Sequence, residues 1–217
     1  MPADAFEMAL VHRVFRDELR CAPILVGSVQ PGQGRRLKRV VDHIANVLSA
    51  LHHHHMAEDE LLWPKLHERT PEHAEIIRHM ETEHELIATS VDKVHLLLAD
   101  WIATAHSASA AQRLISGIKE LTELVDAHLV HEEERIVPLI NENITSDEWR
   151  AATGRGASFI SGRNIAFAIA FAGMTLDSCT ADEYRRFLAC MPSPQRLLVR
   201  LFARRVGARY RARLRAF

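Results

Sequence analysis

The sequence of 217 residues has only three cysteines, and none of them forms a CxxC pair. This excludes a disulfide scaffold and a cysteine-based zinc site, and it favours a reducing compartment. Glycine and proline are also scarce, at nine and eight residues, which excludes a collagen-like or low-complexity chain. The longest apolar run, Ile165 to Met174, is shorter than the roughly 20 residues that cross a bilayer. No signal peptide is predicted, because Asp4 and Glu7 interrupt any early apolar region. We therefore expect a cytoplasmic protein with no transmembrane segment.

Charge is divided unevenly along the chain. Residues 1–150 hold 15 of the 27 Lys and Arg and 25 of the 28 Asp and Glu, whereas residues 151–217 hold 12 and 3. All 14 histidines lie in the first of these parts. Because the two parts differ in chemistry, we predict a histidine-rich domain over residues 1–144 and a basic helical extension over residues 145–217.

The histidine-rich part has the pattern of four long helices. No segment in it alternates polar and apolar residues with the period of two that is typical of strands. The expected helices cover residues 4–26, 35–68, 72–105 and 110–141. Pro23, Pro64 and Pro138 are expected to end or kink them, because proline lacks the amide that continues a helix. Short links between antiparallel neighbours predict an all-α, up-down four-helix bundle.

The basic extension carries its own helix-start signals. Two Thr-x-x-Glu sequences, beginning at Thr145 and Thr180, match the capping-box spacing, and Ser193 with Pro194 is expected to begin a last helix. From residue 196 to the end there are eight arginines and no acidic residue. We favour an extension that is solvated or docked on the bundle, with no nucleic acid expected as a partner. The charge leaves an acidic partner, nucleic acid or an anionic lipid surface as the alternative.

The inward stripe of each expected helix is apolar except at one or two positions. Two helices have one histidine there, and the other two have a histidine followed four residues later by a glutamate. These exceptions are His12, His54, Glu58, His84, His128 and Glu132. Residues four apart on a helix point the same way, and a buried carboxylate is costly unless it is paired or bound to a metal. Four imidazoles and two carboxylates therefore predict a metal site, and they suit two iron, manganese or zinc ions better than one.

The same positions carry a family resemblance. The segments LVHRVFRDEL, HHHHMAEDELLWP, METEHELI and HLVHEEERIVPLI together resemble the hemerythrin-like (HHE cation-binding) domain over about residues 5–142. The resemblance implies a non-haem di-iron centre with an oxo or hydroxo bridge. The ligands that it implies are the same six residues that the inward stripes select.

Two departures from the oxygen-carrying hemerythrins bear on the function. Those proteins have HxxxH on the third helix and HxxxxD on the fourth, whereas here Met80 takes the partner position on the third helix and the fourth has HxxxE. Losing an imidazole leaves a gap in the coordination, or lets water or another side chain fill it. This disfavours reversible oxygen carriage, and an exposed position favours redox chemistry or binding of nitric oxide or peroxide. His55 and His131 are candidates for additional ligands or for hydrogen bonds to ligands, and Asp59 and Glu133 are candidates for such hydrogen bonds.

Two functions within the di-iron interpretation remain open at this point. The first is a protein that binds iron and handles O2, NO or peroxide, with catalase-like peroxide removal or nitric oxide reduction as its enzymatic forms. The alternative is an iron- or oxygen-sensing regulatory protein that acts through interactions rather than turnover. A ferritin-like oxygenase is disfavoured because Glu81 with His84 is the one Glu-x-x-His sequence that fits, and a zinc protease is disfavoured because HExxH is absent.

Overall fold

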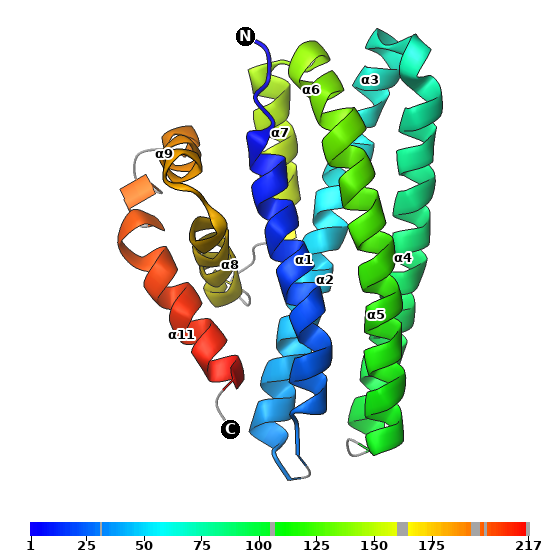
Figure 1. Cartoon of the computed structure of the whole chain (residues 1–217), viewed down its shortest axis with the longest axis vertical. Helices are drawn as coiled ribbons and strands as arrows, with labels where there is room; N and C mark the ends of the chain where they lie inside the picture. The colour runs from blue at the N-terminus through cyan, green and yellow to red at the C-terminus, as the bar shows by residue number, and fades with distance from the viewer. Residues whose placement is uncertain (31, 105–106, 160–164, 192–195, 198, 216–217) are drawn as a thin grey trace.

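The computed structural model describes residues 1–30, 32–104, 107–159, 165–191, 196–197 and 199–215, and these residues are all-α. Four long helices form a helical bundle: α1 (Phe6–Gly27), α2 (Gly34–Leu61), α4 (Ala74–Ala103) and α5 (Ala108–His131). They lie side by side, and consecutive long helices run in alternating directions (Figure 1). The described ranges contain no β-strand, and none of their helices is both long and apolar enough to cross a membrane.

Each long helix buries one apolar face. In α5 the buried residues follow the spacing of three and four that aligns side chains along one face of a helix. They include Leu114, Ile118, Leu121, Val125 and His128. The buried residues of the bundle form two main apolar clusters, one containing Trp101 and the other containing Trp63. The buried histidines and glutamates are polar exceptions in this otherwise apolar interior.

Two of the four expected helices are interrupted. The second ends at Leu61 and is followed by a separate helix, α3 (Trp63–Arg69), in which Pro64 occupies the first turn, where its missing amide costs nothing. The fourth contains a π-helical turn, η2 (Glu132–Ile136), and continues as α6 (Val137–Asn143). Pro23 does not end α1, which continues past it to Gly27.

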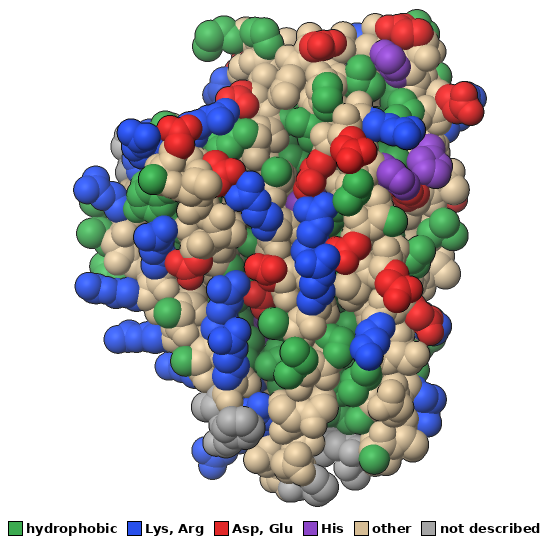
Figure 2. All heavy atoms as spheres, viewed as in Figure 1, with side chains coloured by type: hydrophobic (Ala, Val, Ile, Leu, Met, Phe, Trp, Pro, Cys, Tyr) green, Lys and Arg blue, Asp and Glu red, His purple; other side chains and the backbone are tan. Residues whose placement is uncertain are grey.

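The extension consists of α7 (Ser146–Gly156), α8 (Ile165–Ser178), α9 (Ala181–Cys190) and α11 (Arg204–Arg215). Both predicted capping boxes are confirmed, at Thr145 and Thr180, whereas the predicted start at Ser193 and Pro194 lies outside the described residues. Helix α7 packs along α2, and α8 packs against α1 and α11 (Figure 1). Lys and Arg side chains are concentrated on the side of the molecule formed by α9 and α11 (Figure 2). The domain boundary at residue 144 stays a prediction.

A buried ion-pair network attaches α11 to the bundle. Glu18 of α1 is only 5% exposed, and its carboxylate lies 3.1 Å from His43 Nε2 and 2.9 Å from Arg211 Nη2. The hydroxyl of Tyr210 lies 3.1 Å from the other ring nitrogen of His43, so two neighbouring residues of α11 take part. Burial raises the pKa of Glu18, but the bonds from His43 and Arg211 outweigh burial and the net pKa is lowered.

We expect Arg211→Met to lower the free energy of unfolding by about 1–3 kcal/mol, less than the roughly 3–5 kcal/mol typical of broken buried pairs, because Arg211 is partly exposed. A group with a lowered pKa stabilises the fold above its unfolded pKa, about 4.3 for Glu, and this stabilisation is lost as the pH falls through the folded pKa. Urea unfolding at pH 7 and at pH 3 measures the effect, and the difference between variant and wild type should shrink at pH 3. Arg209→Met, at an exposed position of the same helix, should change little. Equal losses in both variants would contradict the role of the network.

Candidate metal centre

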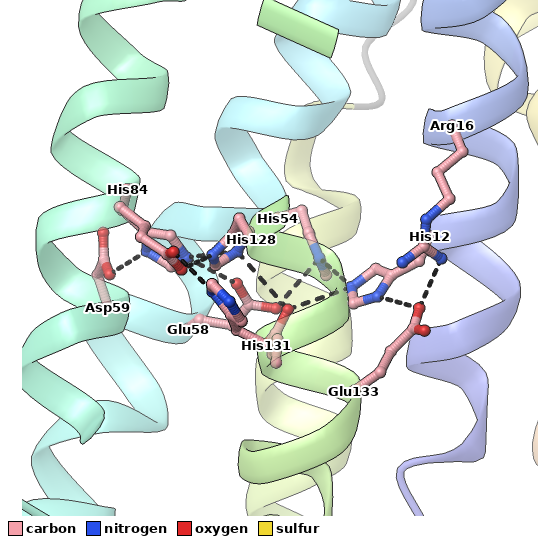
Figure 3. A network of polar contacts seen from close by, with 11 residues as sticks. His12, Arg16, His54, Glu58, Asp59, His84, His128, His131 and Glu133 are labelled. Atoms are coloured by element: carbon pink, nitrogen blue, oxygen red, sulfur yellow. Dashed lines mark hydrogen bonds and ion pairs between the residues drawn. The ribbon is translucent and has the colours of Figure 1, made fainter. Parts of the chain in front are cut away.

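The structure brings the six predicted residues together in the interior of the bundle, and Figure 3 labels five of them, all except Glu132. Each long helix contributes, and the last residue comes from the start of the π-helical turn: His12 from α1, His54 and Glu58 from α2, His84 from α4, His128 from α5, and Glu132 from η2. His12, His128 and Glu132 have no exposed surface. His54 is the most exposed of the six, with 15% of its side chain accessible. The group is therefore a buried set of nitrogen and oxygen atoms, a composition typical of a metal site.

One half of the centre is formed by His12 and His54. Their Nε2 atoms are 3.1 Å apart. Glu132 Oε2 lies 3.3 Å from His12 Nε2, and Glu58 Oε1 lies 3.2 Å from His54 Nε2. Ligand atoms of His12, His54 and Glu132 all lie within 4.8 Å of one another, so one metal ion could contact all three residues.

The other half is formed by three histidines, one of which is outside the set of six. The Nε2 atoms of His84 and His128 are 3.2 Å apart. His55 stacks on His84, with ring centroids 4.2 Å apart and planes 13° apart, and its centroid lies 5.0 Å from that of His128. Ligand atoms of these three residues also lie within 4.8 Å of one another. His55 is 5% exposed, and its Nε2 has no hydrogen-bond partner among the described residues.

The two carboxylates reach both halves. Glu132 Oε2 lies 3.3 Å from His12 Nε2 and 3.7 Å from His128 Nε2. The oxygens of Glu58 lie 3.2 Å from His54 Nε2 and 3.7 Å from His84 Nε2. Within the described part of the chain, Glu58 Oε2 and both oxygens of Glu132 are buried without a hydrogen bond. Buried carboxylate oxygens without donors are costly, and two cations between the helices would satisfy them.

A second set of carboxylates orients the imidazoles from outside. Each of three histidines places its Nδ1 near a carboxylate oxygen: His12 near Glu133 at 2.9 Å, His84 near Asp59 at 2.6 Å, and His128 near Glu83 at 3.0 Å. A carboxylate accepts, so each Nδ1 donates its proton outward, and in a neutral ring Nε2 then carries a lone pair that faces the interior. The predicted positions Asp59 and Glu133 are therefore in contact with ligand candidates.

His131 and Glu83 also belong to this outer set. His131 Nδ1 lies 2.8 Å from Glu83 Oε1, and the other oxygen of Glu83 contacts His128. His131 thus supports His128 through Glu83 and does not take part in the interior cluster. The sequence analysis did not select Glu83, because three glutamates surround His84 at positions 81, 83 and 85 and none of them lies on the inward stripe.

The tautomers of His84 and His128 create a conflict that a cation resolves. Both rings donate Nδ1–H to carboxylates, so both Nε2 atoms carry lone pairs if the rings are neutral. Two lone pairs that face each other at 3.2 Å repel and form no hydrogen bond. A metal ion that accepts both lone pairs would remove the repulsion, and the donor set therefore fits a metal.

The electrostatics of the cluster limit how much charge it can hold without metal. Burial lowers the pKa of His54 to about 3 and lowers that of His55 well below its usual range. Burial and the nearby Glu132 carboxylate raise the pKa of Glu58 well above normal. Burial also raises the pKa of Glu132, but contacts with His12 outweigh burial and hold the net pKa at about 2. Imidazoles that stay neutral are ready to bind metal, while Glu58 would release a proton on binding.

A comparison with protein-family models identifies the domain. Residues 6–140 match the hemerythrin HHE cation binding domain, which is more than half of the chain. The chain belongs to the hemerythrin HHE cation-binding family. No curated protein and no solved structure gives a significant match. All of the interior histidines and glutamates lie inside the matched range of the hemerythrin domain, whereas α7, α8, α9 and α11 lie beyond it.

In this hemerythrin domain, Met80 of α4 stands where the oxygen-carrying hemerythrins have a second histidine, and it is part of the apolar core. Met80 is fully buried and belongs to the cluster that contains Ile77 and Trp63. The imidazole that joins His84 and His128 comes instead from His55 on α2. The centre therefore has five imidazoles, of which four are buried and His54 is partly exposed, although α4 contributes only one.

Two cavities lead to the hemerythrin centre from different sides. One, of about 390 Å³, lies between α2 and α4 and is lined by His55, Asp59 and His84 among others. The second, of about 740 Å³, lies between the bundle and the extension and reaches His54 and Glu58. Both halves of the centre thus have a side chain at the wall of a cavity, through which small molecules could approach.

Proposed function

We propose that the chain is a di-iron protein that binds iron and handles small redox ligands, namely O2, NO or peroxide. In this proposal α1, α2, α4 and α5 form the up-down four-helix bundle of hemerythrin, and manganese or zinc is the alternative metal. The observation that supports it most directly is that the Nε2 atoms of His84 and His128 lie 3.2 Å apart while the Nδ1 atom of each ring contacts a carboxylate. Bound iron would supply a site for electron exchange with such ligands.

The division of the donor atoms supports two ions. His12 and His54 would hold one ion, while the three imidazoles of the other half would hold the second: His55, His84 and His128. Glu58 and Glu132 would span both ions, since each reaches both halves. The chain's own part is to hold the rings in place through hydrogen bonds that Nδ1–H donates to the outer carboxylates.

The unequal halves favour ligand binding on the side of His12 and His54. That half has two imidazoles, so an ion there would have more open positions than an ion held by three. His54 also lies at the wall of the larger cavity, which gives exogenous ligands a route to it. This arrangement supports redox handling of peroxide or nitric oxide over stable oxygen carriage.

The alternative is a sensor of iron, O2 or NO. It is supported by the contact between the extension and the helix that carries His12, because Arg13 pairs with Glu183 of α9 at 2.7 Å. A change in the position of His12 would then be transmitted to the extension. The cytoplasmic location expected from the three unpaired cysteines stays a prediction.

Elemental analysis with an optical spectrum in air is the direct test. We expect two irons per chain and charge-transfer bands in the near ultraviolet. Vigorous oxygen evolution from added peroxide would identify a catalase-like enzyme, and a spectral change with NO without turnover would identify a sensor. A single zinc ion, or no metal at all, in protein purified under iron-replete conditions would contradict the proposal.

A further inference from the structure

The cavity between the bundle and the extension is much larger than a diatomic ligand needs. Its volume of about 740 Å³ is bounded by α1 and α2 on one side and by α7, α8 and α9 on the other. A water molecule takes up about 30 Å³ in the liquid, and pockets for organic ligands typically measure about 300–1,000 Å³. The cavity therefore has the size of a site for an organic molecule.

The wall of this cavity is largely apolar. Aromatic and aliphatic side chains from both sides line it, among them Met8, Phe15, Leu62, Phe171, Phe187 and Met191. Phe15 belongs to the bundle core, and Phe171 packs against it with ring centroids 5.6 Å apart. The side chains that the extension adds thus continue the apolar surface of the bundle. An apolar molecule would gain about 25 cal/mol per Å² of surface removed from water there.

Apart from Glu58, the charged groups at this wall, Glu7 and Arg150, are already engaged. Trp149 Nε1 donates to Glu7 Oε2 at 3.2 Å, and burial raises the pKa of Glu7, which favours its neutral form. Arg150 pairs with Asp147. The hydroxyl of Thr175 donates to the carbonyl of Phe171 at 3.0 Å. These groups leave no strong site for an ionic ligand, so an uncharged ligand fits this wall best.

His54 and Glu58 form part of the wall of the cavity. Both are candidates for holding metal, and Glu58 Oε2 is buried without a hydrogen bond among the described residues. The cavity therefore places an occupant directly beside the centre. Two distant parts of the chain, α1 with α2 and α7 to α9, build this one space, which the hemerythrin domain would not enclose without the extension.

We propose that this cavity binds an uncharged, largely apolar organic molecule beside His54 and Glu58. The extension then acts as the element that adds an organic ligand to a centre which otherwise handles small gases or peroxide. The position of the ligand beside a metal rests on the proposed function, whereas the binding cavity itself does not.

The test uses the full-length, iron-loaded protein and the neutral fluorescent probe N-phenyl-1-naphthylamine. We expect saturable binding of one probe per chain. Ala168→Phe and Ala172→Phe place a larger side chain at half-buried wall positions of α8 and should weaken binding at least tenfold. Ala166→Phe makes the same change at an exposed position of α8 outside the wall and should leave binding unchanged. Circular dichroism and thermal melting establish that each variant is folded.

A second readout locates the probe relative to the centre. The bound probe should be less fluorescent in the iron-loaded protein than in protein reconstituted with zinc, because iron quenches a nearby fluorophore. Absence of saturable binding, or equal binding by Ala168→Phe, Ala172→Phe and Ala166→Phe, would overturn the cavity proposal. Equal fluorescence with iron and zinc would overturn the placement beside the centre. A protein that binds no iron would contradict the proposed function. If Ala168→Phe still weakens probe binding in that protein, the cavity proposal is supported.

Discussion

Replacing Glu58 or Glu132 with alanine is expected to remove at least one metal ion per chain, and the double variant is expected to lose both. Each carboxylate reaches both halves of the centre, at 3.2 and 3.7 Å for Glu58 and at 3.3 and 3.7 Å for Glu132. A group shared by two ions affects the affinity for both when it is removed. Elemental analysis after dialysis measures the loss, and far-ultraviolet circular dichroism should show that the helices remain.

The same variants should separate metal binding from folding. In metal-free wild type, two carboxyl groups are buried without enough partners, so their removal relieves a desolvation cost. Bound metal stabilises the native state by mass action, by about 4 kcal/mol when its concentration is 1,000 times Kd. A chelator should therefore lower the melting temperature of the wild type and leave that of the double variant almost unchanged.

A matched control lies in the same π-helical turn. Glu134 is exposed and two residues from Glu132, so Glu134→Ala changes the same residue type without touching the interior. We expect Glu134→Ala to keep full metal content and the full response to chelator. A Glu58→Ala and Glu132→Ala double variant that stays fully loaded would refute the site.

The helices were predictable because apolar residues recur at helical spacing, a local property of the chain. The positions at which the helices are interrupted could not be predicted from this spacing. Pro64 lies in the first turn of a new helix after a break at Leu62, whereas Pro23 is accommodated inside α1. The π-helical turn that begins at Glu132 was not expected, because no residue in it forbids an ordinary α-helix. In this turn, Glu132 lies near His12 Nε2 and Glu133 lies near His12 Nδ1.

The centre was predictable as far as the inward stripes reach. A buried glutamate one turn after a histidine is conspicuous in an apolar stripe, and the structure brings all six stripe residues together. The contacts of residues beside the stripe could not be predicted in this way. His55 follows His54 directly and points about 100° away from it around α2, so its contact with α4 and α5 depends on how α2 is rotated in the bundle. The cavity next to the extension depends on docking between distant segments and leaves no local pattern in the sequence.

His55 gives rise to the second large effect. We expect His55→Ala to lower metal content from two ions toward one per chain, because it removes one of three imidazoles from the half that contains His84 and His128. The remaining ion should be the one held by His12, His54 and Glu132, which form a group without His55, although His55 also lies near His54 and Glu58. Elemental analysis and the near-ultraviolet spectrum measure the change. His52→Ala, at an exposed position on α2, is the matched control and should keep both ions.

A second substitution tests why His55 has this role. Met80 precedes His84 by one helical turn, so residues 80 and 84 share a face of α4. If His55 supplies the nitrogen that Met80 cannot, Met80→His should restore the second ion in the His55→Ala background and should have little effect on metal content by itself. Two retained ions in His55→Ala alone would show that His55 only packs against His84. A restored ion in the double variant would instead mean that either α2 or α4 can supply the fifth imidazole, and that this chain uses α2.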